Sequence, residues 1–210
     1  MRAAFADGQW EGRLTLTVDR GGHRVRVTAG ADKDAQARRV RCDAPLGDVL
    51  PMQCSLLRAG AHFVGSGMPA LKTGDTTFDA AFNLRGLPEF LVRAGLNDAA
   101  RQGLLRHADV LSSLDIEDGR LVLSIDARRA SPDVVAALVQ IQTRLIDDFR
   151  QTCRALSPEQ RAAEHVRLEA DLAAARATRR RGSMLVALVT IAFVLALLGG
   201  VAVLFVRSLP

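Results

Sequence analysis

The sequence has few of the residues on which recognition and chemistry at protein sites commonly depend. Tyrosine is absent, tryptophan occurs once, and aromatic residues make up 4% of the chain. This composition leaves little material for stacking nucleic-acid bases or sugar rings. The three cysteines, Cys42, Cys54 and Cys153, are widely spaced and form no C-x-x-C pair. Such cysteines are typical of reduced, buried thiols rather than of a disulfide framework or a zinc site.

Sequence signatures of metal ions, cofactors and nucleotides are also missing. The four histidines, His23, His62, His107 and His165, each lack a second histidine or cysteine within four positions. Metal ligands, in contrast, usually occur at short spacings. No G-x-G-x-x-G loop and no G-x-x-x-x-G-K-[ST] loop is found in the chain. The sequence therefore predicts no metal site and no cofactor.

The one candidate for a Ser-His-Asp catalytic triad consists of residues near a glycine turn. Ser66 lies between two glycines, with His62 before it and Asp75 after it. The G-x-S-x-G elbow of hydrolases requires glycine two residues before the serine, where this chain has Val64. The pattern favours a simple chain reversal, and we expect no catalytic residues. An enzyme that acts close to a membrane through a site without a sequence signature is the alternative.

The C-terminal part contains the long apolar run that the rest of the chain lacks. Residues 182–206 include no charged residue. A helix of 23 such residues would rise about 34 Å, enough to cross a hydrocarbon core of roughly 30 Å. The sequence therefore predicts one transmembrane helix over 183–206 and a short tail over 207–210. Small residues recur every four positions and form a candidate pairing face for a homodimer. They are Ala192, Ala196 and Gly200.

Arginines flank this run and predict its orientation. Arg176, Arg179, Arg180 and Arg181 precede the run, and only Arg207 follows it. Basic residues stay on the cytoplasmic side of a membrane. The sequence thus predicts a tail-anchored, single-pass protein of the cell inner (plasma) membrane, with its N-terminal domain in the cytoplasm. The four preceding arginines would contact the membrane surface, and sensing of anionic lipids through them is a further hypothesis for function.

These five arginines account for the net charge of +5. The chain has 28 basic and 23 acidic residues, so the two signs balance when the five are set aside. A neutral domain does not fit nucleic-acid binding, which depends on a basic face. Lysine occurs only twice among the basic residues, and alanine is abundant. That bias indicates a bacterium with a GC-rich genome.

Alternating apolar and polar residues predict β-strands. Residues 13–28 alternate around a glycine turn and predict a hairpin. Residues 114–125 alternate around Asp118-Gly119, the turn chemistry favoured in two-residue hairpins. Residues 77–84 also suit a strand.

Capping residues predict helices in the C-terminal half. Asn97 fits the N-cap of a helix that runs to about Ser112, and Ser131-Pro132 fits the start of another. On the second helix an apolar stripe is predicted to face the core, and four polar residues are predicted to face water. The stripe is Val134, Leu138, Ile141, Leu145 and Phe149, and the polar residues are Gln140, Arg144, Asp147 and Asp148.

A second serine–proline pair predicts the last helix before the apolar run. Ser157 and Gln160 have the spacing of a capping box. The helix that follows has only a weak apolar stripe, at Leu168, Leu172 and Ala175, and is predicted to be a stalk over 157–181. The predicted fold class is therefore α+β: a small β-rich domain with hairpins and packed helices over 1–150, then the stalk, then the transmembrane helix.

One segment resembles a known group of proteins. The pattern F-D-A-A-F-x-L-x-G-x-P-E over 78–89, the pair Leu104-Leu105 and the hairpin over 114–125 are similar to a stretch in bacterial membrane-associated proteins of unknown function. The resemblance implies a small α+β domain tethered to a membrane, and it carries over no functional residues. Those proteins often place membrane helices before the domain, whereas the apolar run here comes last.

The leading hypothesis from the sequence is a non-enzymatic interaction or scaffold module at the cytoplasmic face of a membrane. Its expected partners are the lipid bilayer, a protein at that face, and a second copy of the chain through the membrane helix. Nucleic acid is not expected as a partner.

Overall fold

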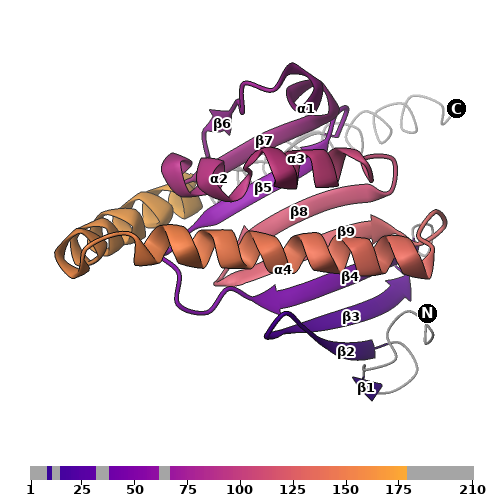
Figure 1. Cartoon of the computed structure of the whole chain (residues 1–210). Coiled ribbons are helices and arrows are strands. Elements are labelled where there is room, and N and C mark those ends of the chain that lie inside the picture. Colours follow the sequence, from indigo (N-terminus) through magenta and orange to yellow (C-terminus); the bar gives the residue numbers. More distant parts are fainter. Residues whose placement is uncertain (1–8, 11–14, 32–37, 62–66, 179–210) are drawn as a thin grey trace, which may run out of the picture. The chain divides into compact units, whose positions relative to one another are not determined.

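Strands from both halves of the chain combine into one antiparallel sheet (Figure 1). The computed structural model describes residues 9–10, 15–31, 38–61 and 67–178. Within them the sheet has nine strands in the order β1-β2-β3-β4-β9-β8-β5-β7-β6. The strands are β1 Gln9–Trp10, β2 Thr15–Arg20, β3 His23–Ala31, β4 Arg38–Pro45, β5 Gln53–Arg58, β6 Ala70–Leu71, β7 Phe82–Leu87, β8 Leu111–Glu117 and β9 Arg120–Asp126.

Both predicted hairpins are confirmed. Strands β2 and β3 pair around Gly21 and Gly22, whose φ angles are +56° and +76°. Strands β8 and β9 pair around Asp118 and Gly119, with φ of +51° and +71°. Two successive positive φ angles define the turn whose twist matches that of the flanking strands. Glycine and aspartate accept this conformation, which explains why these turns can be predicted from sequence.

Helices α2, α3 and α4 lie on one face of the sheet (Figure 1). The helices with defined bounds are α1 Thr76–Ala81, α2 Glu89–Gly95, α3 Asp98–Leu105 and α4 Pro132–Arg154. Ser131 caps α4 as predicted, because its hydroxyl accepts from the Val134 amide at 3.3 Å. Asn97 caps α3, although α3 ends at Leu105 and not near Ser112. The expected strand over 77–84 is instead α1 followed by β7, because Asp75 accepts from two amides of the first turn of α1.

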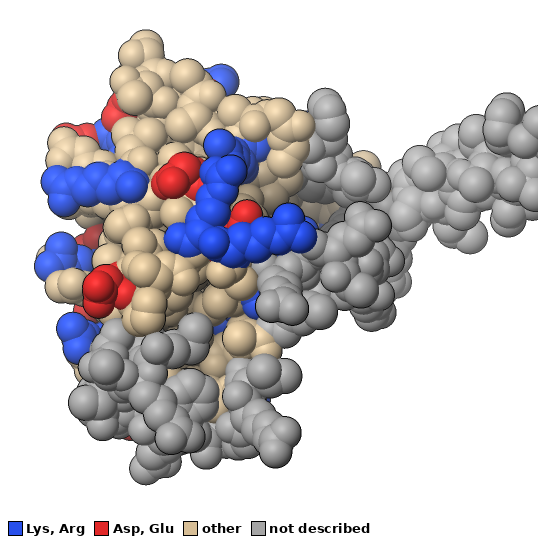
Figure 2. Space-filling view, turned by 90° about the vertical axis from the view of Figure 1, so that its right-hand side faces the viewer, with Lys and Arg blue, Asp and Glu red and all other residues tan. Residues whose placement is uncertain are grey.

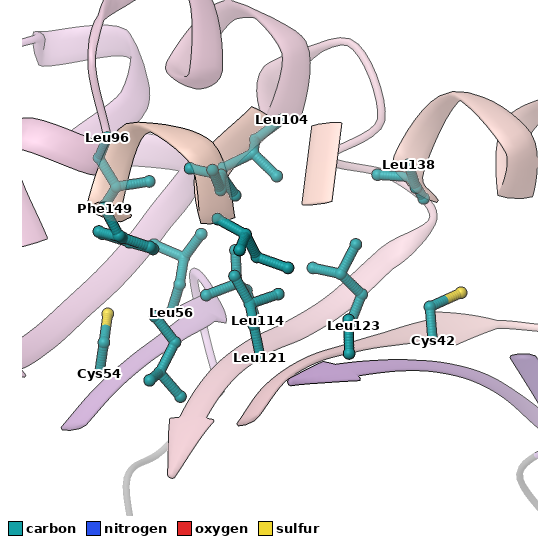
Figure 3. Packing of buried hydrophobic residues seen from close by; sticks show 14 of the residues in the cluster. Cys42, Cys54, Leu56, Leu96, Leu104, Leu114, Leu121, Leu123, Leu138 and Phe149 are labelled. Carbon is teal, nitrogen blue, oxygen red and sulfur yellow. The ribbon is translucent and has the colours of Figure 1, made fainter. Parts of the chain in front are cut away.

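The core fills the layer between α4 and the sheet. Figure 3 shows Leu138 and Phe149 directed toward the sheet, and Leu114, Leu121 and Leu123 directed back at them. The buried face of α4 is wider than the predicted stripe, because α4 contacts α2 and α3 as well as the sheet. Its buried residues are Val135, Leu138, Val139, Gln142, Thr143, Leu145, Ile146, Phe149 and Cys153. The predicted stripe residues Val134 and Ile141 are only half-buried.

The last described helix covers residues 158–178 and begins with the predicted capping box. The Ser157 hydroxyl accepts from the Gln160 amide at 3.2 Å, and the Gln160 side chain accepts from the Ser157 amide at 3.0 Å. Arg161 binds the Asp48 carboxylate at 2.5 Å, and this hydrogen bond lowers the pKa of Asp48. Leu168 is 2% exposed and belongs to the main core. Leu168 of this helix therefore packs into the core beneath the sheet domain.

The predicted fold class is wrong in two respects. The β structure is not a small domain built of hairpins, because β4 pairs with β9 and β5 pairs with β8, which joins the described strands in one nine-stranded sheet. Among the described residues, no helix is long and apolar enough to cross a membrane. The helix over 158–178 carries charged residues along most of its length.

The membrane assignments are corrected accordingly. A transmembrane, tail-anchored, single-pass protein of the inner membrane with a cytoplasmic domain requires a spanning helix, and the described structure contains none. The segment predicted as that helix, 183–206, lies outside the described residues, as does the tail over 207–210. The same holds for Ala192, Ala196 and Gly200 and for Arg179, Arg180 and Arg181.

Candidate functional site

A groove of about 520 Å³ lies between α3 and α4, on the side of these helices that does not contact the sheet. The two helices run antiparallel, so the start of α3 lies beside the second half of α4. The α3 side is lined by Asn97, Ala99, Ala100, Gln102, Gly103, Arg106 and His107. The α4 side is lined by Ala137, Gln140, Ile141, Arg144, Asp147 and Asp148.

Small residues on α3 bring the two helices close together. A Cβ atom added at Gly103 would lie 3.1 Å from Cδ1 of Ile141, which is tighter than an ordinary contact. Ala99 and Ala100 line the groove beside it. Because these side chains are short, the walls of the groove are formed by the longer polar residues of α4 and of the turn after α3.

Two carboxylates define one end of the groove. Asp148 Oδ2 accepts a hydrogen bond from Asn97 Nδ2 at 2.9 Å, while Asn97 Oδ1 caps α3 through the Ala100 amide at 3.0 Å. Asp147 Oδ1 accepts from His23 Nε2 at 2.7 Å. The other oxygen of each carboxylate has no hydrogen-bond partner in the described part of the chain. Each carboxylate is therefore held in place and keeps one oxygen for a ligand.

Asp147 is held by a chain of contacts that begins in a loop. Arg150 Nε donates to the Leu46 carbonyl at 2.8 Å, and Arg150 Nη1 lies 3.3 Å from His23 Nδ1. A guanidinium group can only donate, so Nδ1 accepts and Nε2 carries the proton that is donated to Asp147. His23 is buried, and both of its ring nitrogens are held by these contacts. The groove thus has a support that extends into the loop after β4.

Cations define the rest of the groove. Arg144 is exposed on α4, and Arg106 is exposed in the turn after α3. Neither side chain makes a hydrogen bond or an ion pair with any described residue, although Asp147 and Asp148 lie within one helical turn of Arg144. The distance along α4 from Asp148 to Ala137, the first α4 residue that lines the groove, is about 16 Å at 1.5 Å per residue. Arg144 therefore lies on α4 within one turn of the carboxylates, whereas Arg106 follows the C-terminal end of α3, toward the other end of the groove. No ion pair joins these groups in the described structure.

The cysteines do not supply a nucleophile. All three are free and buried, as the sequence predicts. Burial raises the pKa of Cys42 to about 12, and burial together with the nearby Asp115 carboxylate raises that of Cys54 to about 12. Thiols with such pKa values carry almost no thiolate at neutral pH.

Of the other residues weighed from the sequence, His107 lines the groove, and Asp75 and Arg176 do not. Asp75 caps α1 and lies 3.6 Å from Arg101, whereas His62 and Ser66 lie outside the described residues. Arg176 is exposed near the end of the helix over 158–178. No group of three or more potential metal ligands occurs among the residues that the structure describes.

The α4 side of this groove is visible in the sequence as a polar face. Gln140, Arg144, Asp147 and Asp148 were recognised as one polar face and interpreted as solvated. The α3 side was missed. Its small residues, Ala99, Ala100 and Gly103, do not show in the sequence that α3 packs beside α4.

Fold and site together define a protein in which one face of a large antiparallel sheet supports helices that form a polar groove. No protein-family model matches the chain, and no curated protein sequence matches it. Among solved structures, the chain is similar to the crystal structure of the mycobacterial trehalose monomycolate transport factor A, TtfA. The TM-score is 0.46 and the identity 12%, over 69% of this chain and 73% of that chain. A likeness of this size carries no conclusion about function.

Proposed function

We propose that this protein is a non-enzymatic binding module that holds an extended segment of a protein partner in the groove between α3 and α4. One observation carries the proposal: carboxylates held in place and arginines without an ion pair line a single groove. Unpaired charges beside a rigid helix are suited to recognition, because a partner of complementary charge can satisfy them.

The groove is well supported for this role. One side of α4 is buried over its whole length, and Asp147 and Asp148 are held by His23 and Asn97. Little side-chain freedom is therefore lost at the carboxylates when a ligand binds, which favours affinity.

The spacing of charges describes the partner segment. A basic side chain would pair with Asp147 and Asp148, and an acidic one with Arg106. The separation of about 16 Å corresponds to about five residues of extended chain at 3.3 Å each. The partner segment therefore carries a basic and an acidic residue about five positions apart.

A capped, fluorescent hexapeptide with lysine at its first position and glutamate at its sixth tests the proposal. We expect saturable binding by fluorescence anisotropy, weakened roughly tenfold by Asp148→Asn and by Arg106→Gln, since each removes one charge-assisted contact. Glu159→Gln removes an exposed charge outside the groove and serves as the matched control.

A second peptide of the same composition, with lysine and glutamate adjacent, separates spacing from net charge. It is expected to bind more weakly because it cannot reach both ends. Equal affinity for both peptides, or equal effects of Glu159→Gln and Asp148→Asn, would show that the groove does not hold an extended segment.

A further inference from the structure

Two arginines, Arg58 and Arg129, lie together at the end of the sheet where β5 and β9 finish and β8 begins. In the register of the sheet, Leu57 at the end of β5 pairs with Ser113, and Leu111 at the start of β8 pairs with Ile125 of β9. This end of the strands lies on the right in Figure 1 and faces the viewer in Figure 2. Figure 2 shows basic side chains gathered on this side, with single carboxylates between them.

Two arginines from distant parts of the chain meet at one carbonyl oxygen. Arg58 Nη1 and Arg129 Nη1 each donate to the Asp109 carbonyl at 3.4 Å. Their Nη1 atoms therefore lie no more than twice that distance apart. Arg58 ends β5, Asp109 lies in the turn before β8, and Arg129 lies in the turn after β9. The fold, and not the local sequence, brings the two guanidinium groups together.

Neither arginine forms an ion pair with a described residue. The Asp109 carboxylate, although it belongs to the residue whose carbonyl binds both arginines, lies beyond salt-bridge distance of either. The nearby Asp126 Oδ1 accepts from the Arg128 amide at 3.0 Å. Two like charges are thus held close together without an anion between them, and an anion that bridges them would remove their mutual repulsion.

We infer that Arg58 and Arg129 form a binding site for a phosphate group carried as a monoester on a small molecule. Each guanidinium offers several N–H donors in a flat fork, and a phosphate monoester presents three oxygens in different directions. It can therefore accept from both arginines at once. A carboxylate has two oxygens in one plane and is satisfied by a single fork, so a pair of arginines favours phosphate. The 23-residue helix α4 begins at Pro132, three residues beyond Arg129, and its N-terminal end carries a partial positive charge.

The test uses O-phosphoserine as the probe, titrated into the ¹⁵N-labelled full chain at constant ionic strength and followed by NMR. We expect saturable shifts at the amides of Arg58, Asp109 and Arg129. Arg58→Gln and Arg129→Gln should each weaken binding roughly tenfold, because each removes a charge-assisted contact. The double variant should show no saturation. Arg129→Lys keeps the charge but loses the fork, so its affinity should fall between those of the parent and Arg129→Gln.

Arg24→Gln is the matched control, because Arg24 is an exposed arginine at the opposite end of the sheet. Its affinity for O-phosphoserine should stay within twofold of the parent. Equal weakening by Arg24→Gln and Arg58→Gln would show that the probe responds only to net charge. Unchanged binding in the double variant would also overturn the proposal. Both side chains are exposed, so the variants are expected to fold, and circular dichroism checks this.

Discussion

A single buried amide joins α4 to the centre of the sheet. The Gln142 side chain is 0% exposed, and its Nε2 donates to the carbonyls of Cys42 at 3.2 Å and Leu121 at 2.8 Å. Both partners are acceptors, so the orientation of the amide is fixed by chemistry. Its Oε1 has no hydrogen-bond partner among the described residues. A polar residue on the buried face of α4 thus both stabilises the packing and leaves one acceptor unsatisfied.

Two substitutions of Gln142 distinguish the effect of its donated hydrogen bonds from the effect of burying a polar side chain. Gln142→Leu removes two hydrogen bonds and the unsatisfied oxygen together, so we expect a loss of only about 1–2 kcal/mol in the free energy of unfolding. Gln142→Glu places an acceptor against two carbonyls and is expected to cost more, about 3 kcal/mol or above at pH 7. Urea unfolding measures both values. If Gln142→Glu were the milder change, the assigned hydrogen bonds would be wrong.

At the scale of elements, the contact between α2 and α4 depends on one glycine. A Cβ atom at Gly95 would lie 2.1 Å from Cε1 of Phe149, whose ring is buried in the core. Phe149 cannot move away without leaving its place above the sheet. The α3–α4 contact is looser, because a Cβ atom at Gly103 would lie 3.1 Å from the flexible end of Ile141.

The two glycines therefore predict different outcomes for the same substitution. Gly95→Ala should lower the free energy of unfolding by about 1–3 kcal/mol, because overpacking displaces α2. Gly103→Ala should change it by less than about 1 kcal/mol, because the helix propensity of alanine offsets the closer contact. Thermal unfolding of both variants checks this, and equal losses would contradict the difference in packing.

Element types were easier to predict than their partners. The turns at Gly21-Gly22 and Asp118-Gly119 and the caps Ser131 and Ser157 were correct, because each depends on residues only a few positions apart. The prediction of a strand over 77–84 was wrong, because the alternation of apolar and polar residues there did not reveal that Asp75 caps a helix. The polar residues of α4 that line the groove could be predicted from their helical spacing, but the packing of α3 against α4 could not. Long-range pairing leaves no signal in a single sequence.

At the scale of the whole molecule, the core extends into the helix over 158–178. Leu168 of this helix is 2% exposed, whereas Val166, two residues away, is 71% exposed. The sequence pattern suggested a stalk because alanine dominates the apolar stripe. Packing of one leucine, with the Arg161–Asp48 ion pair, connects the start of this helix to the sheet domain.

This pair of residues gives a matched test of the connection. Leu168→Ala should lower the free energy of unfolding by about 2–4 kcal/mol, because it leaves a cavity in the core. Val166→Ala should change it by no more than about 0.5 kcal/mol. Both should unfold in a single transition when followed by circular dichroism. Equal stabilities, or a separate early transition for the C-terminal helix, would assign that helix to an independent unit.

The strand order also has a consequence for how the chain is made. The strands β8 and β9 lie between β4 and β5 in the sheet, although among the described strands they are synthesised last. Until residue 126 has left the ribosome, the facing edges of β4 and β5 have no partner and expose unpaired backbone groups. Unpaired strand edges promote aggregation. Newly made chains should therefore depend on chaperones until the β8–β9 hairpin inserts and closes the sheet.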